Sequence, residues 1–392
     1  MTLTTTLAHL DTPAALIDLS RMQRNITRMQ QRADALCVRL RPHVKTSKCT
    51  PVVQAQLAAG AQGITVSTLK EASQFFADGI TDILYAVGIV ASKLPAALAL
   101  RRQGCDLKLI TDSVASAEAI VAFGREHGER FEVWIEIDTD GHRSGIKPAE
   151  PALIDVGRVL RDGGCTLGGV MTHAGSSYDH DTPDALIAVA EQERAGVVLA
   201  AERTRAAGLP CPVVSLGSTP TTLMAEHLTG VTEMRAGVYV FFDLVMQNVG
   251  VCSSDEIALS VLATVIGHQV DKGWAIVDAG WMAMSRDRGT AKQKHDYGYG
   301  QVCAMDGTVM PGCTLSGANQ EHGILSFAMA DAGAGQAMPG APGQGDIATR
   351  LPVGTRLRIL PNHACATGAQ FPEYHALTET GDLTTWERFH GW

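Results

Sequence analysis

Three basic side chains occupy alternate positions in the stretch RPHVKTSK, residues 41–48: Arg41, His43 and Lys45. Alternate residues of a strand point to one side, so a predicted strand over 38–44 would direct all three toward one face. A lysine near other cations and partly desolvated has a lowered pKa, and its amine can form an imine with an aldehyde. Lys45 is therefore a candidate nucleophile; the alternative is a solvated lysine at a strand end.

The segment SLGSTPT, residues 215–221, has the composition of a phosphate-binding turn. Gly217 lets the backbone approach an anion, Ser218 and Thr219 offer hydroxyl groups, and Pro220 suits the first turn of a helix with free N–H groups. The alternative is an ordinary N-cap ahead of proline. A reactive lysine combined with a phosphate site indicates a phosphorylated aldehyde cofactor, for which pyridoxal 5'-phosphate is the obvious candidate.

The segment PNHACATG, residues 361–368, places His363 and Cys365 two positions apart at a predicted strand end. An imidazole and a thiolate that face the same way can share one metal ion. Two protein ligands would leave an open, catalytic site. This ligand pair favours Zn²⁺, although Mn²⁺, Co²⁺ or Mg²⁺ can occupy such a site in practice. The alternative is a buried cysteine beside a loop histidine.

The composition excludes several classes of protein. The chain of 392 residues is 45% hydrophobic, which excludes a disordered protein, and its formal charge of -9 without a basic run argues against nucleic-acid binding. No apolar stretch approaches the ~20 residues of a membrane span, and the N-terminal stretch does not resemble a signal peptide. The nine cysteines lack a CxxC pair, which argues against a disulfide framework. We expect a cytoplasmic protein without membrane or nucleic-acid partners.

The elements that must position these residues alternate between strands and helices up to about residue 250. A helix is predicted over 20–37 because Met22, Ile26, Met29, Ala33 and Leu36 recur at helical spacing. We predict eight strands, at 38–44, 63–68, 82–88, 107–112, 131–138, 167–173, 212–217 and 233–240. This alternation predicts an α/β fold, a (β/α)8 TIM-type barrel over residues 13–250.

The remaining residues, 251–392, predict a second, mostly β domain that carries the metal ligands, and residues 1–12 are assigned to it as well. Within it, the Gly-, Pro- and Ala-rich segment 331–346 predicts a mobile loop. In the barrel, the unusual polar residues follow strands at their C-terminal ends, where barrel enzymes place their active sites.

Six motifs in this order resemble the pyridoxal-phosphate enzymes of the alanine-racemase-like barrel type, known as fold type III: RPHVKTSK, DTDGHRSGI, THAGSSY, SLGSTPT, RAGVYVFFD and PNHACATG. More narrowly, they resemble the D-serine dehydratase and D-threonine aldolase group. The similarity covers essentially the whole chain, and the combination is specific although each motif alone is not. The resemblance implies a barrel that holds the cofactor, a β domain and a homodimer with active sites near the subunit interface.

The resemblance also implies roles for individual residues. Lys45 would be the lysine that binds the cofactor as a Schiff base, and His363 and Cys365 would bind the divalent metal. Seven further residues would contact the cofactor, three around the pyridine ring and four at the phosphate: Arg143, His173 and Tyr178, and Gly217, Ser218, Thr219 and Tyr239.

The resulting hypothesis is a dehydratase of 3-hydroxy-D-amino acids, in which the metal assists loss of the β-hydroxyl and a 2-oxo acid and ammonia are released. For 3-hydroxyaspartate the 2-oxo acid would be oxaloacetate, and for D-serine pyruvate. The similar aldolases carry a carboxylate two residues after the histidine, so Cys365 favours the dehydratase.

Two alternatives stay open. One is retro-aldol cleavage, which would give glycine and an aldehyde; Glu321 and His322 in the QEHG segment could supply a further acid or base, or form a buried structural pair. The other is a non-catalytic pyridoxal-phosphate-binding protein, which the second β domain argues against. The substrate side chain is also open. An acidic one needs a cation, and the candidates are Arg41, Lys48, Arg143, Arg286 and Arg288.

Overall fold

The structure, a computed structural model, describes residue 7, residues 9–328 and residues 346–392. The chain divides into two compact units. The first comprises Met1–Arg24 with Val240–Arg388, and the second Asn25–Tyr239 with Phe389–Trp392. The predicted loop 331–346 lies almost wholly outside the described residues. Across the described ranges, no helix is long and apolar enough to cross a membrane.

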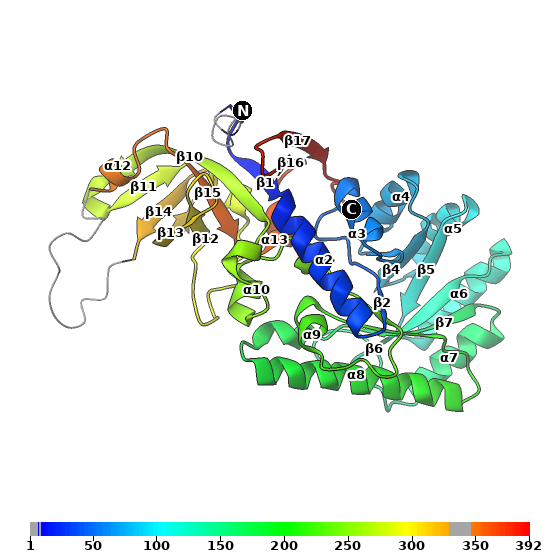
Figure 1. Ribbon diagram of the computed structural model, residues 1–392. Coiled ribbons are helices and arrows are strands. Elements are labelled where there is room, and N and C mark those ends of the chain that lie inside the picture. The colour runs from blue at the N-terminus through cyan, green and yellow to red at the C-terminus, as the bar shows by residue number, and fades with distance from the viewer. Residues whose placement is uncertain (1–6, 8, 329–345) are drawn as a thin grey trace. The chain divides into compact units, whose positions relative to one another are not determined.

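The second unit contains a sheet of eight parallel strands in the order β2-β9-β8-β7-β6-β5-β4-β3 (Figure 1). The strands are β2 (Arg39–Leu40), β3 (Ile64–Val66), β4 (Asp82–Gly88), β5 (Asp106–Thr111), β6 (Glu132–Ile137), β7 (Thr166–Thr172), β8 (Val213–Leu216) and β9 (Glu233–Met234). Beyond β2, Val44 donates a backbone hydrogen bond to Thr65 in β3 (2.9 Å), and Thr65 donates to Pro42 (2.8 Å). These bonds join the two ends of the sheet, so the predicted eight-stranded barrel is confirmed.

Helices connect the strands and cover the outside of the barrel (Figure 1). They are α2 (Leu19–Ala35), α3 (Thr50–Ala58), α4 (Leu69–Ala77), α5 (Leu94–Arg102), α6 (Val114–His127), α7 (Ala152–Asp162), α8 (Pro183–Ala206) and α9 (Thr219–Met224). Met22, Ile26, Met29 and Ala33 of α2 are buried, as the helical spacing predicts. The side chains of Thr68, Ser113 and Thr182 cap the N-termini of α4, α6 and α8, which fixes where these helices begin.

The strand predicted over 38–44 is wrong in its extent, because β2 ends at Leu40. Backbone hydrogen bonds nevertheless continue the pairing beyond Leu40, since Arg41 donates to Met234 (3.0 Å) and His43 donates to Ala236 (2.8 Å). Residues 44–47 form a turn. The last barrel strand is also shorter than the predicted 233–240, since β9 ends at Met234.

The first unit is built on a nine-stranded sheet in the order β11-β14-β13-β12-β15-β10-β1-β16-β17. The strands are β1 (Ala14–Asp18), β10 (Leu259–Gln269), β11 (Trp274–Val277), β12 (Gly300–Cys303), β13 (Val309–Ala318), β14 (Gly323–Phe327), β15 (Arg356–Pro361), β16 (Glu373–Leu377) and β17 (Leu383–Glu387). Short helices accompany it: α10 (Leu244–Val249), α11 (Trp281–Met284), α12 (Ile347–Arg350) and α13 (Ala364–Gly368). A second, mostly β unit is therefore confirmed.

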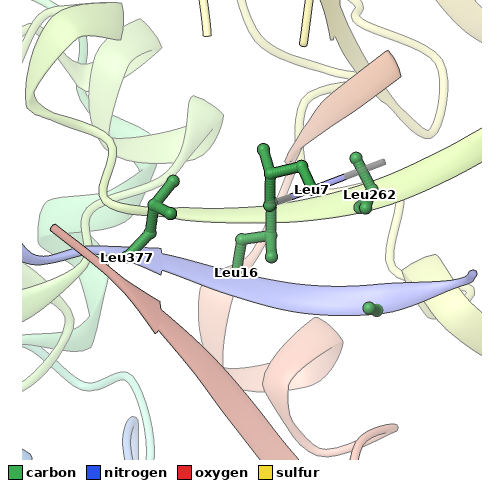
Figure 2. Packing of buried hydrophobic residues seen from close by; sticks show 5 residues of the cluster. Leu7, Leu16, Leu262 and Leu377 are labelled. Atoms are coloured by element: carbon green, nitrogen blue, oxygen red, sulfur yellow. The ribbon is translucent and has the colours of Figure 1, made fainter. Parts of the chain in front are cut away.

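Residues 13–24 and 240–250 belong to this β unit and not to the barrel, in which the sequence predicts them. Strand β1 pairs antiparallel with β10 and parallel with β16. Its Leu16 packs against Leu7, Leu262 and Leu377 in a buried apolar cluster (Figure 2). Burial of such leucines stabilises the fold by roughly 1.5–3 kcal/mol each.

Candidate active site

Lys45 lies on the turn after β2, at the C-terminal end of the barrel strands, and its side chain is exposed. The sequence hypothesis expected a partly desolvated Lys45 amine, whereas the described residues of the chain leave this side chain exposed. The following residues of the turn are firmly held: Lys48 has a left-handed φ of 45° and forms an ion pair with Glu71 (3.0 Å). The backbone N–H of Phe389 donates to the carbonyl of Lys48 (2.7 Å). The turn that presents Lys45 is thus fixed by contacts on its C-terminal side.

The guanidinium of Arg41 lies at the starts of the barrel strands, whereas Lys45 lies at their C-terminal ends. Its guanidinium is buried and donates to Glu233 (2.9 Å) and to Asp82 (2.8 Å). Asp82 also pairs with Lys108. Arg41 is therefore part of a charge network at the starts of the barrel strands.

His43 and His173 are two imidazoles surrounded by cations. Burial, then Lys45 and Arg235, lower the pKa of His43 well below its ordinary value. Burial also lowers the pKa of His173, to about 3, with further contributions from Lys45 and Arg143. Nδ1 of His173 lies 2.9 Å from the carbonyl oxygen of Gly217 and donates to it. Both rings are therefore neutral at physiological pH, and the Nε2 atom of His173 is an acceptor.

Arg143 lies on the loop after β6 and is exposed. Its charge acts on both histidines and on Glu136 of β6, whose pKa is nevertheless raised, mainly by burial. Ser144, the next residue, donates to Glu136 (3.1 Å). Arg143 and His173 thus lie at the same end of the barrel.

Tyr178 lies in the 3-10 helix η2 (Gly175–Asp179), which follows β7. Its ring centroid is 6.3 Å from that of His173. This helix is attached to the loop that carries Arg143, because the backbone N–H of Ser176 donates to Asp140 (2.9 Å). Arg143, His173 and Tyr178 therefore come from two loops that are bonded to each other.

The turn after β8 is an N-cap as well as a candidate phosphate site. Ser218 Oγ accepts from the backbone N–H of Thr221 (3.2 Å), and the Thr221 side chain accepts in return from Ser218. Thr219 Oγ1 accepts from the backbone N–H of Tyr239 (3.2 Å). The hydroxyl groups on which the sequence hypothesis relied are thus engaged within the protein, so the N-cap alternative holds for Ser218.

Two backbone N–H groups of these turns stay free. Within the described chain, the N–H groups of Thr219 and Gly237 donate to no other group, although Thr219 is only 1% exposed. A Cβ atom at residue 237 would lie 2.9 Å from the His43 carbonyl oxygen, so this close approach requires glycine. Buried donors without an acceptor are rare in proteins. An anion such as a phosphate would supply the missing acceptor.

Tyr239, predicted at the phosphate, is fully buried in the 3-10 helix η3 (Val238–Val240). Its hydroxyl oxygen accepts from Gln56 Nε2 (2.8 Å), and burial raises its pKa above the ordinary value. The tyrosine hydroxyl is therefore protonated and can act as a donor.

Arg235 is a functional candidate that the sequence analysis missed. It is buried directly after β9, donates to the Thr172 carbonyl (2.6 Å) and to the Ser215 hydroxyl, and acts on both histidines. Burial lowers its pKa to about 10, so it stays charged. A signal was present: a charged residue inside a predicted barrel strand is unusual enough to mark a site.

In the β unit, His363 occupies the N-cap position of α13, where its side chain makes no capping hydrogen bond, and Cys365 lies within that helix. The prediction that both lie on a strand end is wrong, because β15 ends at Pro361. Their side chains nevertheless interact: burial lowers the pKa of His363, but Cys365 and Asp287 outweigh it and raise the pKa well above its ordinary value. His363 Nδ1 lies 2.6 Å from Asp287 Oδ2, which leaves Nε2 as the nitrogen that can bind a metal.

Asp243 binds the backbone between His363 and Cys365. It is fully buried and accepts from the backbone N–H groups of Ala364 (2.9 Å) and Met246 (3.0 Å). One carboxylate thus joins the starts of α10 and α13. The described residues contain no cluster of three or more His, Cys, Asp or Glu side chains placed to hold a metal.

Comparison with known proteins shows what the chain resembles. The family profile of the alanine racemase N-terminal domain matches residues 17–245, and that of a serine dehydratase domain matches residues 258–377. The chain therefore belongs to the family of proteins with an alanine racemase N-terminal domain, and it carries a serine dehydratase domain after that domain. It is 72% identical to D-threo-3-hydroxyaspartate dehydratase of Delftia sp. (strain HT23) over 388 residues, or 99% of each chain.

Solved structures agree with this assignment. That of the Delftia dehydratase superposes with a TM-score of 0.94 at 72% identity, over 98% of this chain and 99% of that one. The D-threonine aldolase from Filomicrobium marinum is 26% identical with a TM-score of 0.81, over 97% of this chain and 95% of that one. The (β/α)8 barrel and the second β unit are thus features of the family.

The remaining candidates differ in how far they are engaged. Three of the five candidate cations are paired within the chain: Arg41 with Glu233 and Asp82, Lys48 with Glu71, and Arg288 with Asp296 (2.8 Å). Arg143 and Arg286 form no ion pair within the described residues, and Arg286 lies over the Trp281 ring. Glu321 and His322 are exposed, so they do not form the buried pair that was one alternative.

Proposed function

We propose that this chain is a dehydratase that converts D-threo-3-hydroxyaspartate to oxaloacetate and ammonia, using pyridoxal 5'-phosphate and a divalent metal. The single observation that carries the proposal is the 72% identity to D-threo-3-hydroxyaspartate dehydratase over 99% of both chains. D-Serine, which would give pyruvate, is a second candidate substrate, because relatives from Dictyostelium discoideum and other organisms are D-serine dehydratases.

The residues at the barrel mouth fit the cofactor. Lys45 would bind its aldehyde, and the free N–H groups of Thr219 and Gly237 would bind its phosphate, with Gly217, Ser218 and Tyr239 shaping the turn. His173, Arg143 and Tyr178 would surround the ring. When bound, pyridoxal phosphate withdraws electrons from the substrate Cα, so that the Cα proton becomes acidic.

The chain's own residues then supply proton transfer and charge. The Lys45 amine would be the base that removes the Cα proton of the substrate. His43 and His173 stay neutral and do not compete for this proton, since their pKa values are lowered. Arg143 and Arg235 keep this end of the barrel positive, which favours a substrate with two carboxylates.

The metal would be held by His363 and Cys365, with Zn²⁺ favoured and Mn²⁺, Co²⁺ or Mg²⁺ as alternatives. A metal in an open site polarises the oxygen bound to it, which makes a hydroxyl a better leaving group. Two solved structures of D-threo-3-hydroxyaspartate dehydratase support this role. One carries a cysteine-to-alanine substitution and is a metal-free form, and the other carries a histidine-to-alanine substitution two positions earlier in that chain. His363 and Cys365 have the same spacing.

Product analysis tests the reaction. The purified chain would be incubated with pyridoxal phosphate, Zn²⁺ and D-threo-3-hydroxyaspartate, with D-serine and D-threonine in parallel. Ammonia and oxaloacetate in equal amounts are expected from the first substrate. Glycine with glyoxylate would show retro-aldol cleavage instead, and a D-threonine aldolase of Arthrobacter is among the relatives, at 28% identity.

The cofactor assignment has a separate test. Replacing Lys45 with alanine should abolish the cofactor absorbance that borohydride bleaches in the native protein, and persistence of that band would refute the assignment. The matched control is Lys93→Ala, since Lys93 contacts Tyr85 (3.2 Å) and no proposed cofactor residue.

We propose in addition that the protein is a cytoplasmic homodimer, as the family resemblance implies. Light scattering of the purified protein would test the dimer, since a monomer at micromolar concentration would contradict it. Fractionation of the native cells would test the location.

A further inference from the structure

Glu193 is a buried carboxyl group on the outer layer of the barrel. It belongs to α8, a helix of 24 residues, and is 1% exposed. Glu191, two residues earlier, is exposed and pairs with Arg194, as expected for an acidic residue on a surface helix. Burying a carboxyl group costs free energy unless it makes hydrogen bonds. The hydrogen bonds of Glu193 therefore indicate why it is there.

One oxygen of Glu193 joins two turns at the C-terminal end of the barrel. Oε1 accepts from the backbone N–H of Ala174 (2.8 Å), directly after His173, and from that of Gly217 (3.1 Å), directly before Ser218. A third bond ties the same turns together, since His173 Nδ1 donates to the Gly217 carbonyl (2.9 Å). The turn that follows His173 and the turn at Gly217 are thus fixed to each other by these three hydrogen bonds, two of which share the buried Oε1 atom.

We propose that Glu193 is a positioning residue for the cofactor: it holds the turns after β7 and β8 in the arrangement that binds the phosphate. Its carboxyl oxygen Oε1 is bonded to the peptide groups behind the site and acts through them. The inference rests on the proposed function, because it needs pyridoxal phosphate at Gly217–Thr219.

The chain around Gly217 cannot easily compensate for loss of this contact. Gly217 has a φ of 132°, and a Cβ atom there would lie 2.4 Å from the Arg235 carbonyl oxygen. Its N–H group is buried and has no other acceptor within the described residues. Without Glu193 the turn must move or leave two buried donors unpaired, and either change alters the position of the Thr219 N–H group.

The charge state of Glu193 is consistent with a neighbouring phosphate. Burial raises its pKa, although the Thr221 hydroxyl and the two backbone N–H groups act in the opposite direction. A raised pKa weakens the tendency of this carboxyl group to carry a negative charge near a phosphate dianion. Oε2 has no hydrogen-bond partner within the described residues. Glutamine, which is neutral and keeps Oε1 as an acceptor, is therefore the conservative replacement.

The test compares two ligands that differ only in the phosphate. Cofactor-free native protein and its variants would be titrated with pyridoxal phosphate and with pyridoxal, and the ratio of the two dissociation constants measured by absorbance. Glu193→Leu should lower the native preference for the phosphorylated ligand by about tenfold or more, which corresponds to one buried donor left unpaired. Glu193→Gln should keep the ratio within about threefold, because its amide oxygen still accepts both bonds. The control Glu191→Leu changes the same helix without touching either turn.

The outcomes separate the two proposals. If the native protein binds neither ligand, the proposed function is wrong and this inference fails with it. If the native protein prefers pyridoxal phosphate but Glu193→Leu weakens both ligands equally, Glu193 is only structural and the inference alone is overturned. Should the leucine variant not fold, Glu193→Asp serves instead: its shorter side chain cannot reach both N–H groups, and an unchanged ratio would again overturn the inference.

Discussion

Asp287 should determine how tightly the β unit binds the proposed metal. Its Oδ2 atom lies 2.6 Å from His363 Nδ1, so it holds the ring with Nε2 available for the metal. Replacing Asp287 with asparagine keeps the size of the side chain but removes the charge, and the amide can present its NH₂ group to the ring instead of an acceptor. The histidine then loses both its orientation and part of its basicity.

The size of the effect follows from the contact and its exposure. A hydrogen bond to a charged group contributes about 1.5–3 kcal/mol, or roughly 10- to 150-fold in an equilibrium constant. The side chains of His363 and Asp287 are 42% and 35% exposed, so water can replace part of the contact. We therefore expect a loss in the lower part of that range, about tenfold in metal affinity.

The assay is competition for Zn²⁺ against a chelating dye, and no catalytic turnover is needed. Asp296→Asn is the matched control, because it removes the same charge from the segment between α11 and β12, where Asp296 pairs with Arg288 (2.8 Å). An affinity of Asp287→Asn equal to that of the control would refute the argument that Asp287 orients the metal ligand. If replacement of His363 itself left the Zn²⁺ affinity equal to that of the native protein, the assignment of the metal to this site would be wrong.

Three further predictions concern other parts of the two units. Cys365→Ala should keep the cofactor absorbance and lose Zn²⁺, unlike the control Cys252→Ala; full activity after exhaustive chelation would contradict the role of the metal. His173 is neutral in the folded chain because its pKa is lowered from 6.5 to about 3, so the folded state loses stability as the pH falls from 6.5 toward 3. In the cofactor-free protein, His173→Gln should therefore reduce the slope of the unfolding free energy against pH by about 1.4 kcal/mol per pH unit between about pH 6 and 4. Urea titrations at several pH values would measure this slope, and an unchanged slope would be evidence against a neutral His173. Gly237→Ala should weaken the binding of pyridoxal phosphate more than that of pyridoxal, since the new Cβ would lie 2.9 Å from the His43 carbonyl oxygen. The control is Gly267→Ala, whose new Cβ would have no atom within 4 Å. Equal losses of affinity for both ligands would argue against a phosphate contact at residue 237.

Much of the fold could be predicted from local patterns. Each of the eight predicted barrel strands contains a strand of the parallel sheet or overlaps it, because strand and helix periodicities are properties of neighbouring residues. The predictions were wrong in the length of β2 and β9 and in the boundary of the barrel. Strand β2 ends at Leu40, earlier than predicted, and the pairing of β1 with β10 and β16 assigns residues 14–24 to the β unit.

The sequence by itself determined the family and the residues that its motifs contain, Lys45, His363 and Cys365 among them, because these motifs are contiguous and their spacing is readable. The supporting residues were decided only by the tertiary structure. Asp287 is 76 positions from His363, and Glu193 is 24 positions from Gly217. Such pairs form because the folded chain brings separate segments together, and no local periodicity records which segments meet. Arg235 and Glu193 look like ordinary charged residues in the sequence; burial and their bonds to neighbouring turns make them part of the site.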